Sequence, residues 1–234
     1  MENIEDNIKT NYEPLKEIKR IDEHYISHEI KHLLHFEKGF LFTTKSLLLR
    51  PGKAIREFLF EDRKKYVKPI LFLILTSVIF TFVTHSLHIT FSFFNIDNVV
   101  PLKGKIRSKE IGEWTDKYTG YAQLIMGIFI AFWTKIFFRK FKCNIYEILV
   151  LLSFVLGEAI LILTFFNVLA KVFENGYLAL SGIISYFVYI IWAVGQFFGE
   201  KKAINYIKSS FVYFLGNVTY MGTLILIAYL LKFI

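Results

Sequence analysis

The chain has 234 residues, of which 54% are hydrophobic and 18% aromatic, and it carries a formal net charge of +8. Average soluble domains are roughly 45–50% apolar. The apolar residues of this chain also gather in long runs, so the composition excludes an ordinary soluble domain and indicates a polytopic membrane protein. The single cysteine, Cys143, excludes an internal disulfide and a zinc ribbon built on cysteines.

The N-terminal part precedes the first long apolar run. Residues 1–25 are polar and mixed in charge, without the apolar stretch of a cleavable signal peptide, so we expect a flexible or loosely helical tail. Residues 26–68 mix Phe and Leu with Lys and Arg, which is typical of helices at the bilayer surface. We therefore expect juxtamembrane amphipathic helices there, on the cytoplasmic side.

Breaks inside this amphipathic segment predict three short helices. Gly39 is expected to end the first, and Thr43 or Thr44 to cap the second. Pro51, which follows Arg50, is expected to open the third. The third helix has an apolar side that suits the bilayer interface, formed by Ile55, Phe58 and Leu59.

Five apolar runs follow, and each is long enough for a transmembrane span of roughly 20 residues. They cover residues 69–91, 120–138, 146–170, 177–198 and 211–231. Tyr and Trp lie near their ends, as in the aromatic belt of a membrane protein. The predicted fold is therefore all-α, with a transmembrane domain of five helices over residues 69–234 after the N-terminal amphipathic helices.

The distribution of Lys and Arg predicts the orientation of these spans. Cations gather in residues 45–68, after the second span at 139–142, and between the fourth and fifth spans at 201–208. Lys and Arg are enriched in cytoplasmic loops, so we expect a cytoplasmic N-terminus and an outside C-terminus in the cell inner (cytoplasmic) membrane. The long loop at 92–119 is an exception, because it holds cations of its own on the opposite side.

The sequence HEIKH at residues 28–32 matches H-E-x-x-H, the signature of zinc metalloproteases. In such a site His28 and His32 are the metal ligands, one helical turn apart, and Glu29 is the base. A catalytic zinc needs a closed site with a further ligand, whereas this motif precedes the first span among Lys, Glu and His. We therefore interpret it as the polar side of an interfacial helix and expect no catalytic residue and no cofactor. A structural zinc at His28 and His32, or joint protonation as the pH falls, is the alternative.

Ionisable residues inside the predicted spans are a second group of candidates. Glu158 lies near the middle of the third span, where a carboxyl group is expensive to bury and usually faces the bundle interior or a water path. An ion or proton relay and a structural hydrogen bond between helices explain this residue equally well. The polar residues that could meet it are Ser153, His85, His88, Asn217 and Gln196.

The expected partners are the lipid bilayer and a second copy of the chain or another protein. The basic stretch RKKYVK at residues 63–68 is interpreted as a juxtamembrane anchor to anionic lipid. The sequence has no glycine-rich phosphate loop, nucleophile elbow or paired-carboxylate motif, and we expect no nucleic-acid partner.

Residues 28–73 resemble the signature of an uncharacterised family of small bacterial membrane proteins, a domain of unknown function. The family pattern reads approximately HEI-x-H, KGFL-x-T, RPG-x-x-IRE and Y-x-x-P. The residues of this chain that match it after the first element include Gly39, Arg50, Pro51, Gly52, Arg56, Tyr66 and Pro69. The resemblance implies that HEIKH belongs to a longer juxtamembrane pattern followed by five spans. Family members often carry an N-terminal zinc ribbon, which this chain lacks.

The plan of five spans with an inside N-terminus also resembles the Yip1-type membrane proteins, which implies a role in membrane organisation without catalysis. We therefore predict a non-enzymatic integral membrane protein that acts through oligomerisation, a partner or lipid, in membrane organisation or an accessory role. Two alternatives are a pore or ion or proton transporter that uses Glu158, and an accessory protein of a bacterial defence locus with an RNA-targeting CRISPR system. A zinc metalloprotease at His28, Glu29 and His32 is disfavoured.

Overall fold

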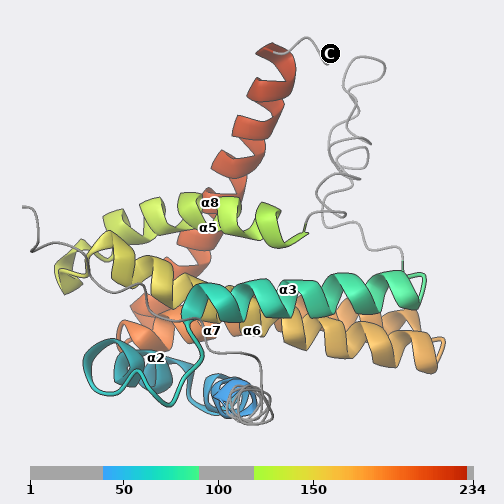
Figure 1. Ribbon diagram of the computed structural model, residues 1–234. Helices are drawn as coiled ribbons and strands as arrows, with labels where there is room; N and C mark the ends of the chain where they lie inside the picture. The colour runs from blue at the N-terminus through green and yellow to red at the C-terminus, as the bar shows by residue number, and fades with distance from the viewer. Residues whose placement is uncertain (1–38, 90–118, 231–234) are drawn as a thin grey trace, which may run out of the picture. The chain divides into compact units, whose positions relative to one another are not determined.

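The computed structural model describes residues 39–89 and 119–230, and these residues form helices joined by turns and short links. The elements are a helix at Gly39–Leu49, α2 (Pro51–Phe60), α3 (Pro69–Ser86), α5 (Thr119–Phe137), the 3-10 turn η2 (Arg139–Phe141), α6 (Ile145–Val172), α7 (Gly176–Phe197) and α8 (Ala203–Leu230) (Figure 1). The predicted all-α class is confirmed for the described residues. They all belong to the second of two compact units, which spans Gly39–Ile234.

Local sequence sets several helix ends. Pro51 and Pro69 occupy the start of α2 and α3, where a missing N–H leaves no hydrogen bond unmade. A capping box starts α6: the Asn144 side chain accepts the N–H of Glu147 at 2.8 Å, and the Glu147 carboxylate accepts the N–H of Asn144 at 2.8 Å. The side chain of Asn175 caps the first turn of α7.

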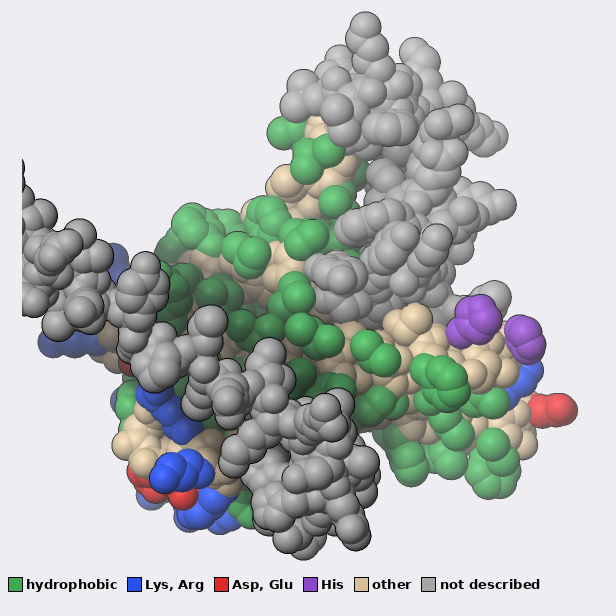
Figure 2. Space-filling view, viewed as in Figure 1, with side chains coloured by type: hydrophobic (Ala, Val, Ile, Leu, Met, Phe, Trp, Pro, Cys, Tyr) green, Lys and Arg blue, Asp and Glu red, His purple; other side chains and the backbone are tan. Residues whose placement is uncertain are grey.

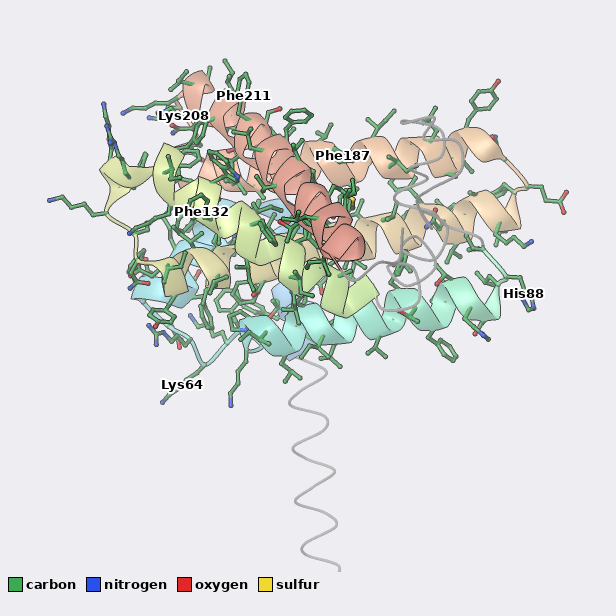
Figure 3. The ribbon with its side chains drawn as sticks, turned by 90° about the horizontal axis from the view of Figure 1, so that it is seen from above. Lys64, His88, Phe132, Phe187, Lys208 and Phe211 are labelled. Atoms are coloured by element: carbon green, nitrogen blue, oxygen red, sulfur yellow. The ribbon has the colours of Figure 1, made fainter. Side chains whose placement is uncertain are left out.

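The helix α6 is the centre of the described bundle. It packs against α3, α5 and α7, and 72% of the residues in its most apolar stretch are buried. The helices α3, α6 and α7 run side by side (Figures 1 and 3). Near the start of α6, the ring of Phe154 contacts the rings of Phe58 in α2 and Phe72 in α3, with centroids 5.1 Å and 5.9 Å away.

The helices α5 and α8 pack on each other, and α8 also packs against α7. The outer faces of these helices are apolar, and Figure 2 shows hydrophobic side chains over much of the visible helix surface. Among the exposed residues, Phe132 of α5 and Phe211 of α8 are 59% and 55% exposed (Figure 3). An apolar outer face is what a bilayer environment requires.

Four helices are long and apolar enough to cross a membrane, by length and composition: Pro69–Ser86, Ile145–Val172, Gly176–Phe197 and Ala203–Ile227. The predicted count of five spans is not confirmed. The predicted span at 120–138 corresponds to α5, whose described apolar stretch Ala122–Phe137 is shorter than the range of about 17–25 residues for a spanning helix. The last helix also begins at Ala203, eight residues before the predicted 211, so polar residues of the α7–α8 link extend it.

The apolar side predicted for the third juxtamembrane helix is covered by protein. This helix is α2, and Ile55, Phe58 and Leu59 are all buried against the bundle, where α2 packs on α7 and α6. The predicted contact of this side with the bilayer interface is therefore not supported. The predicted tail at 1–25 and the first of the three predicted juxtamembrane helices, before Gly39, lie outside the described residues.

The charges separate between the two ends of the helices. From Lys53 onward, each described Lys and Arg except Lys171 lies in α2, in the α2–α3, α5–α6 or α7–α8 link, or within two helical turns of one of these links. Figure 3 shows Lys64 and Lys208 at one end and His88 at the other, and Figure 2 shows the same separation. We call the first the basic end. The structure thus brings together the three regions that the sequence predicts to be cytoplasmic.

Candidate functional site

The start of α2 touches the end of α7 so closely that residue 52 must be glycine. The N–H of Gly52 donates to Oε1 of Gln196 at 2.7 Å. A Cβ on Gly52 would lie 2.6 Å from the main-chain carbon of Gln196 and 2.7 Å from the nitrogen of Phe197. Since backbone atoms cannot move aside as a side chain can, the glycine of the RPG step is explained by close packing rather than by chemistry.

Arg56, one turn further along α2, caps α7. Its Nη1 donates to the main-chain carbonyl oxygens of Gln196 at 2.9 Å and Phe197 at 2.8 Å. These are the last two residues of α7, where carbonyl groups run out of partners from a following helical turn, although that of Gln196 also accepts the N–H of Gly199 at 3.3 Å. A guanidinium group satisfies them and places a positive charge at the negative end of the helix dipole. Arg50 precedes α2 and makes no capping hydrogen bond with its side chain.

Thr43 links the helix Gly39–Leu49 to Val67 in the α2–α3 link, two residues before α3. Its hydroxyl donates to the carbonyl oxygen of Gly39 at 2.7 Å and accepts the N–H of Val67 at 3.0 Å, and its side chain is fully buried. The sequence predicted that Gly39 ends one helix and that Thr43 or Thr44 caps the next, and the structure differs. Gly39 is helical, and Thr43 and Thr44 lie inside the helix rather than at its N-cap, where the buried Thr43 hydroxyl bonds back to the carbonyl oxygen of Gly39 instead of capping a first turn.

Glu57 ties the end of α2 to the link that follows. It accepts the hydroxyl of Tyr66 at 3.1 Å, and its carboxylate lies 3.4 Å from Nζ of Lys65, which also pairs with Asp62 at 3.5 Å. Burial, together with the hydrogen bond and charge of Glu57, raises the pKa of Tyr66 to about 12. The N–H of Lys64 and the charge of Lys65 lower the pKa of Asp62. Pro69 then begins α3. Hydrogen bonds and ion pairs therefore hold the link between the end of α2 and the start of α3.

We call residues 39–69 the brace, because their polar groups hold the basic end together. Arg63 adds hydrogen bonds from its guanidinium to the carbonyl oxygens of Phe58 and Leu59, at 3.3 Å and 3.2 Å, near the end of α2. A longer contact joins the brace to the middle of the bundle, since the hydroxyl of Tyr189 in α7 donates to the carbonyl oxygen of Leu47 at 3.2 Å.

Glu158 is buried in α6, with 1% of its surface exposed. It lies within electrostatic reach of Tyr189, and its Oε2 has no hydrogen-bond partner among the described residues. A buried carboxylate oxygen without a hydrogen-bond partner is costly, and it points to a structural or functional reason for its presence. The sequence did not single out Tyr189. The feature that could have identified Tyr189 is its position in the middle of the apolar run 177–198, because the tyrosines of an aromatic belt lie near the ends of a span.

The other polar residues predicted to meet Glu158 are used elsewhere. Ser153 and Asn217 donate to carbonyl oxygens of their own helices, Leu149 at 2.8 Å and Tyr213 at 2.9 Å. His85, in the last turn of α3, and His88, just after it, are exposed, and Figure 3 shows His88 at the end of the bundle away from Lys64 and Lys208. Gln196 accepts the N–H of Gly52. The structure therefore does not assemble the predicted polar cluster. His28, Glu29 and His32 lie outside the described residues.

The arrangement defines a helical membrane protein, with four candidate spans and a hydrogen-bonded brace at its basic end. A model of the family described as "Protein of unknown function (DUF3667)" matches residues 37–81, which include the brace and most of α3. This fits the resemblance to an uncharacterised family that the sequence shows over residues 28–73, which overlap the matched segment. No curated protein and no solved structure matches the chain.

Proposed function

We propose that this chain is a non-enzymatic integral membrane protein of the cytoplasmic membrane, which acts by associating with further copies of itself through the outer face of α8. The observation that carries the proposal is an apolar stripe on this helix, formed by Ile207, Phe211, Phe214 and Val218. These residues are 50–64% exposed and follow one another at intervals of four, three and four, the spacing of a helix–helix seam. Only 22% of the most apolar stretch of α8 is buried, so the stripe is free for another helix.

The contacts of the brace support a scaffold rather than an active site. Thr43, Gly52 and Arg56 lie in the segment that the family model matches, and each directs its polar group to a partner inside the protein. A catalytic group needs a donor, acceptor or nucleophile that is available to a substrate. Because these groups are already engaged, the matched segment stabilises the bundle and leaves recognition to the surface.

The basic end supports a cytoplasmic position for the three links that form it, with the C-terminus outside. Labelling of Cys143 in the α5–α6 link tests this orientation. We expect an impermeant maleimide to label Cys143 in inverted vesicles and not in intact cells. Labelling in intact cells with protection in inverted vesicles would contradict the orientation.

Self-association is measured by photobleaching of single labelled molecules in phospholipid bilayers. For the wild type we expect two or more bleaching steps in each fluorescent spot, at dilutions where a monomeric membrane protein gives one step. The variant Phe211→Ala/Phe214→Ala removes two exposed rings from the stripe and is expected to give mainly single chains. Its matched control is Phe82→Ala/Phe165→Ala, which removes two exposed rings from α3 and α6. Single chains for the wild type, or equal loss in both variants, would overturn the proposal.

The unpartnered oxygen of Glu158 favours one second candidate, an ion or proton path through the bundle. This function requires flux in vesicles that changes in Glu158→Gln while the protein still inserts. If vesicles with the wild type show no ion or proton flux, and vesicles with Glu158→Gln show the same, this candidate is refuted. The carboxyl group then has a structural role.

A further inference from the structure

Ring stacking joins two links at the basic end that are far apart in the sequence. Phe138, which follows α5, stacks on Phe198, which follows α7, with centroids 3.9 Å apart and an interplanar angle of 10°. Phe141 of η2 contacts the same ring of Phe198 at 5.1 Å. The side chain of Asn205 in α8 donates to the carbonyl oxygen of Phe198 at 2.8 Å, which fixes the second link. The α5–α6 and α7–α8 links therefore form one surface.

This surface concentrates positive charge. The α5–α6 link contributes three exposed cations and the α7–α8 link two, and Lys208 holds its Nζ 5.9 Å from the ring centroid of Phe138. The five exposed cations are Arg139, Lys140, Lys142, Lys201 and Lys202.

The acidic groups of these links do not neutralise the charge. Two acids, Glu147 in the first turn of α6 and Glu200, accompany the five exposed cations, so the acids are outnumbered although Glu147 keeps its charge in the capping box. Among the described residues, both recorded ion pairs involve Lys65 in the brace, and none involves these five cations. Cations held close together without counter-charges repel one another, so the surface favours an anionic ligand.

Exposed apolar side chains accompany the cations in the chain. Ile136 lies in the last turn of α5, Phe141 in η2 and Ile204 at the start of α8, and they are 45%, 45% and 52% exposed. A free phosphate or a nucleic-acid backbone would use the cations and gain nothing from aliphatic side chains. A phospholipid uses both, because its phosphate meets the cations while its acyl chains lie along the apolar helix ends.

We propose that the α5–α6 and α7–α8 links together bind the headgroup of an anionic phospholipid. This proposal rests on the proposed function only in so far as it places the basic end at the membrane surface. Attraction to an anionic headgroup is screened by salt, so the preference is expected to weaken as ionic strength rises.

The experiment is native mass spectrometry of the detergent-purified full chain with an equimolar mixture of phosphatidylglycerol and phosphatidylcholine. We expect the wild type to retain phosphatidylglycerol at least fivefold over phosphatidylcholine. The variant Arg139→Gln/Lys140→Gln/Lys142→Gln is expected to lower this ratio at least threefold. The control Lys45→Gln/Lys53→Gln/Lys171→Gln removes three exposed cations that lie outside both links and outside the basic stretch 63–68, and it is expected to keep the ratio within a factor of 1.5.

Several outcomes would overturn the proposal. They are no preference in the wild type, an equal loss in both triple variants, and displacement of the lipid by soluble glycerol phosphate or by a short RNA at matched concentration. Circular dichroism of each variant separates a lost site from a lost fold. Resistance of the protein to alkaline extraction from membranes tests insertion separately. A chain that inserts and shows no lipid preference therefore refutes this proposal alone, and a chain that does not insert refutes the proposed function.

Discussion

The helices α6 and α8 have the same length, 28 residues each, and occupy opposite situations in the bundle. In the most apolar stretch of α6, 72% of the residues are buried, against 22% in α8. The buried helix nevertheless holds Glu158 and Asn167, whereas the outer face of α8 holds Ile, Phe and Val. In a bilayer the solvent is apolar, so polar groups are sheltered inside the protein and apolar groups face outward.

The comparison also shows that hydropathy alone does not identify the helix that lipid surrounds. Both helices qualify as candidate spans by length and composition. The difference between them comes from neighbours: α6 packs against α3, α5 and α7, whereas α8 packs on α5 and α7 along one side. Pairs of matched substitutions can therefore test the difference directly.

The largest effect is expected from truncation of a leucine in each helix. Leu163 of α6 is fully buried, and Leu226 of α8 is 55% exposed. We expect Leu163→Ala to lower the free energy of unfolding by about 2–5 kcal/mol because it leaves a cavity. Leu226→Ala should cost less than about 0.5 kcal/mol, since lipid or detergent fills the space. Unfolding titrations in mixed micelles measure both, and equal costs would mean that the two helices do not differ in burial.

The next effect distinguishes the two sides of α8. A Cβ on Gly216 would lie 2.5 Å from Cγ1 and 2.9 Å from Cα of Ile130 in α5, whereas a Cβ on Gly222 would meet nothing within 4 Å. Gly216→Ala should therefore cost about 1–3 kcal/mol by forcing α5 and α8 apart. Gly222→Ala on the same helix is the control and should leave the thermal unfolding temperature unchanged or slightly raised. A loss in the control as large as in Gly216→Ala would contradict the α5–α8 packing.

A smaller effect is expected from polar residues of the two helices. Glu158→Gln should change the free energy of unfolding by less than about 1 kcal/mol, or stabilise the protein, because a neutral amide is cheaper to bury than a carboxylate. Asn217→Ala in α8 should cost about 1 kcal/mol or less, since its amide bonds only within its own helix. Strong destabilisation by Glu158→Gln would instead reveal a donor that depends on the carboxylate.

The smallest effect concerns the link before α6 and depends on pH. Burial, and then the charge of Glu147, raises the pKa of the Cys143 thiol. The folded protein therefore holds the thiol proton more tightly than the unfolded chain does, which adds to the free energy of unfolding below the unfolded pKa. This contribution is lost as the pH rises through the folded pKa. Because the thiolate is the nucleophile, maleimide should react with the folded protein more slowly than with the unfolded chain. The difference should narrow as the pH rises through the folded pKa, and a constant rate ratio from pH 7 to 10 would contradict it.

The sequence predicted most of the helices, but it did not predict which helices and side chains contact one another. The prolines at 51 and 69 mark helix starts correctly because their effect is local. The signals at Gly39, Thr43 and Thr44 failed, because tertiary contacts override local preferences there: the buried Thr43 hydroxyl bonds to the main chain of Val67. The predicted cluster around Glu158 failed for a different reason. Depth in a span places residues at a level in the membrane, but it does not say which way a helix is rotated.

The sequence by itself determined that the described chain is helical, that it holds apolar segments of spanning length, and that its cations lie in particular links. These features depend on residue type, run length and local capping, which act within a few residues. Tertiary structure alone decided that Gly52 and Arg56 close on the end of α7, that α6 is buried, and that Phe138 and Phe198 stack. Each of these contacts joins residues that are distant in the chain, so it depends on how whole helices pack rather than on the local sequence.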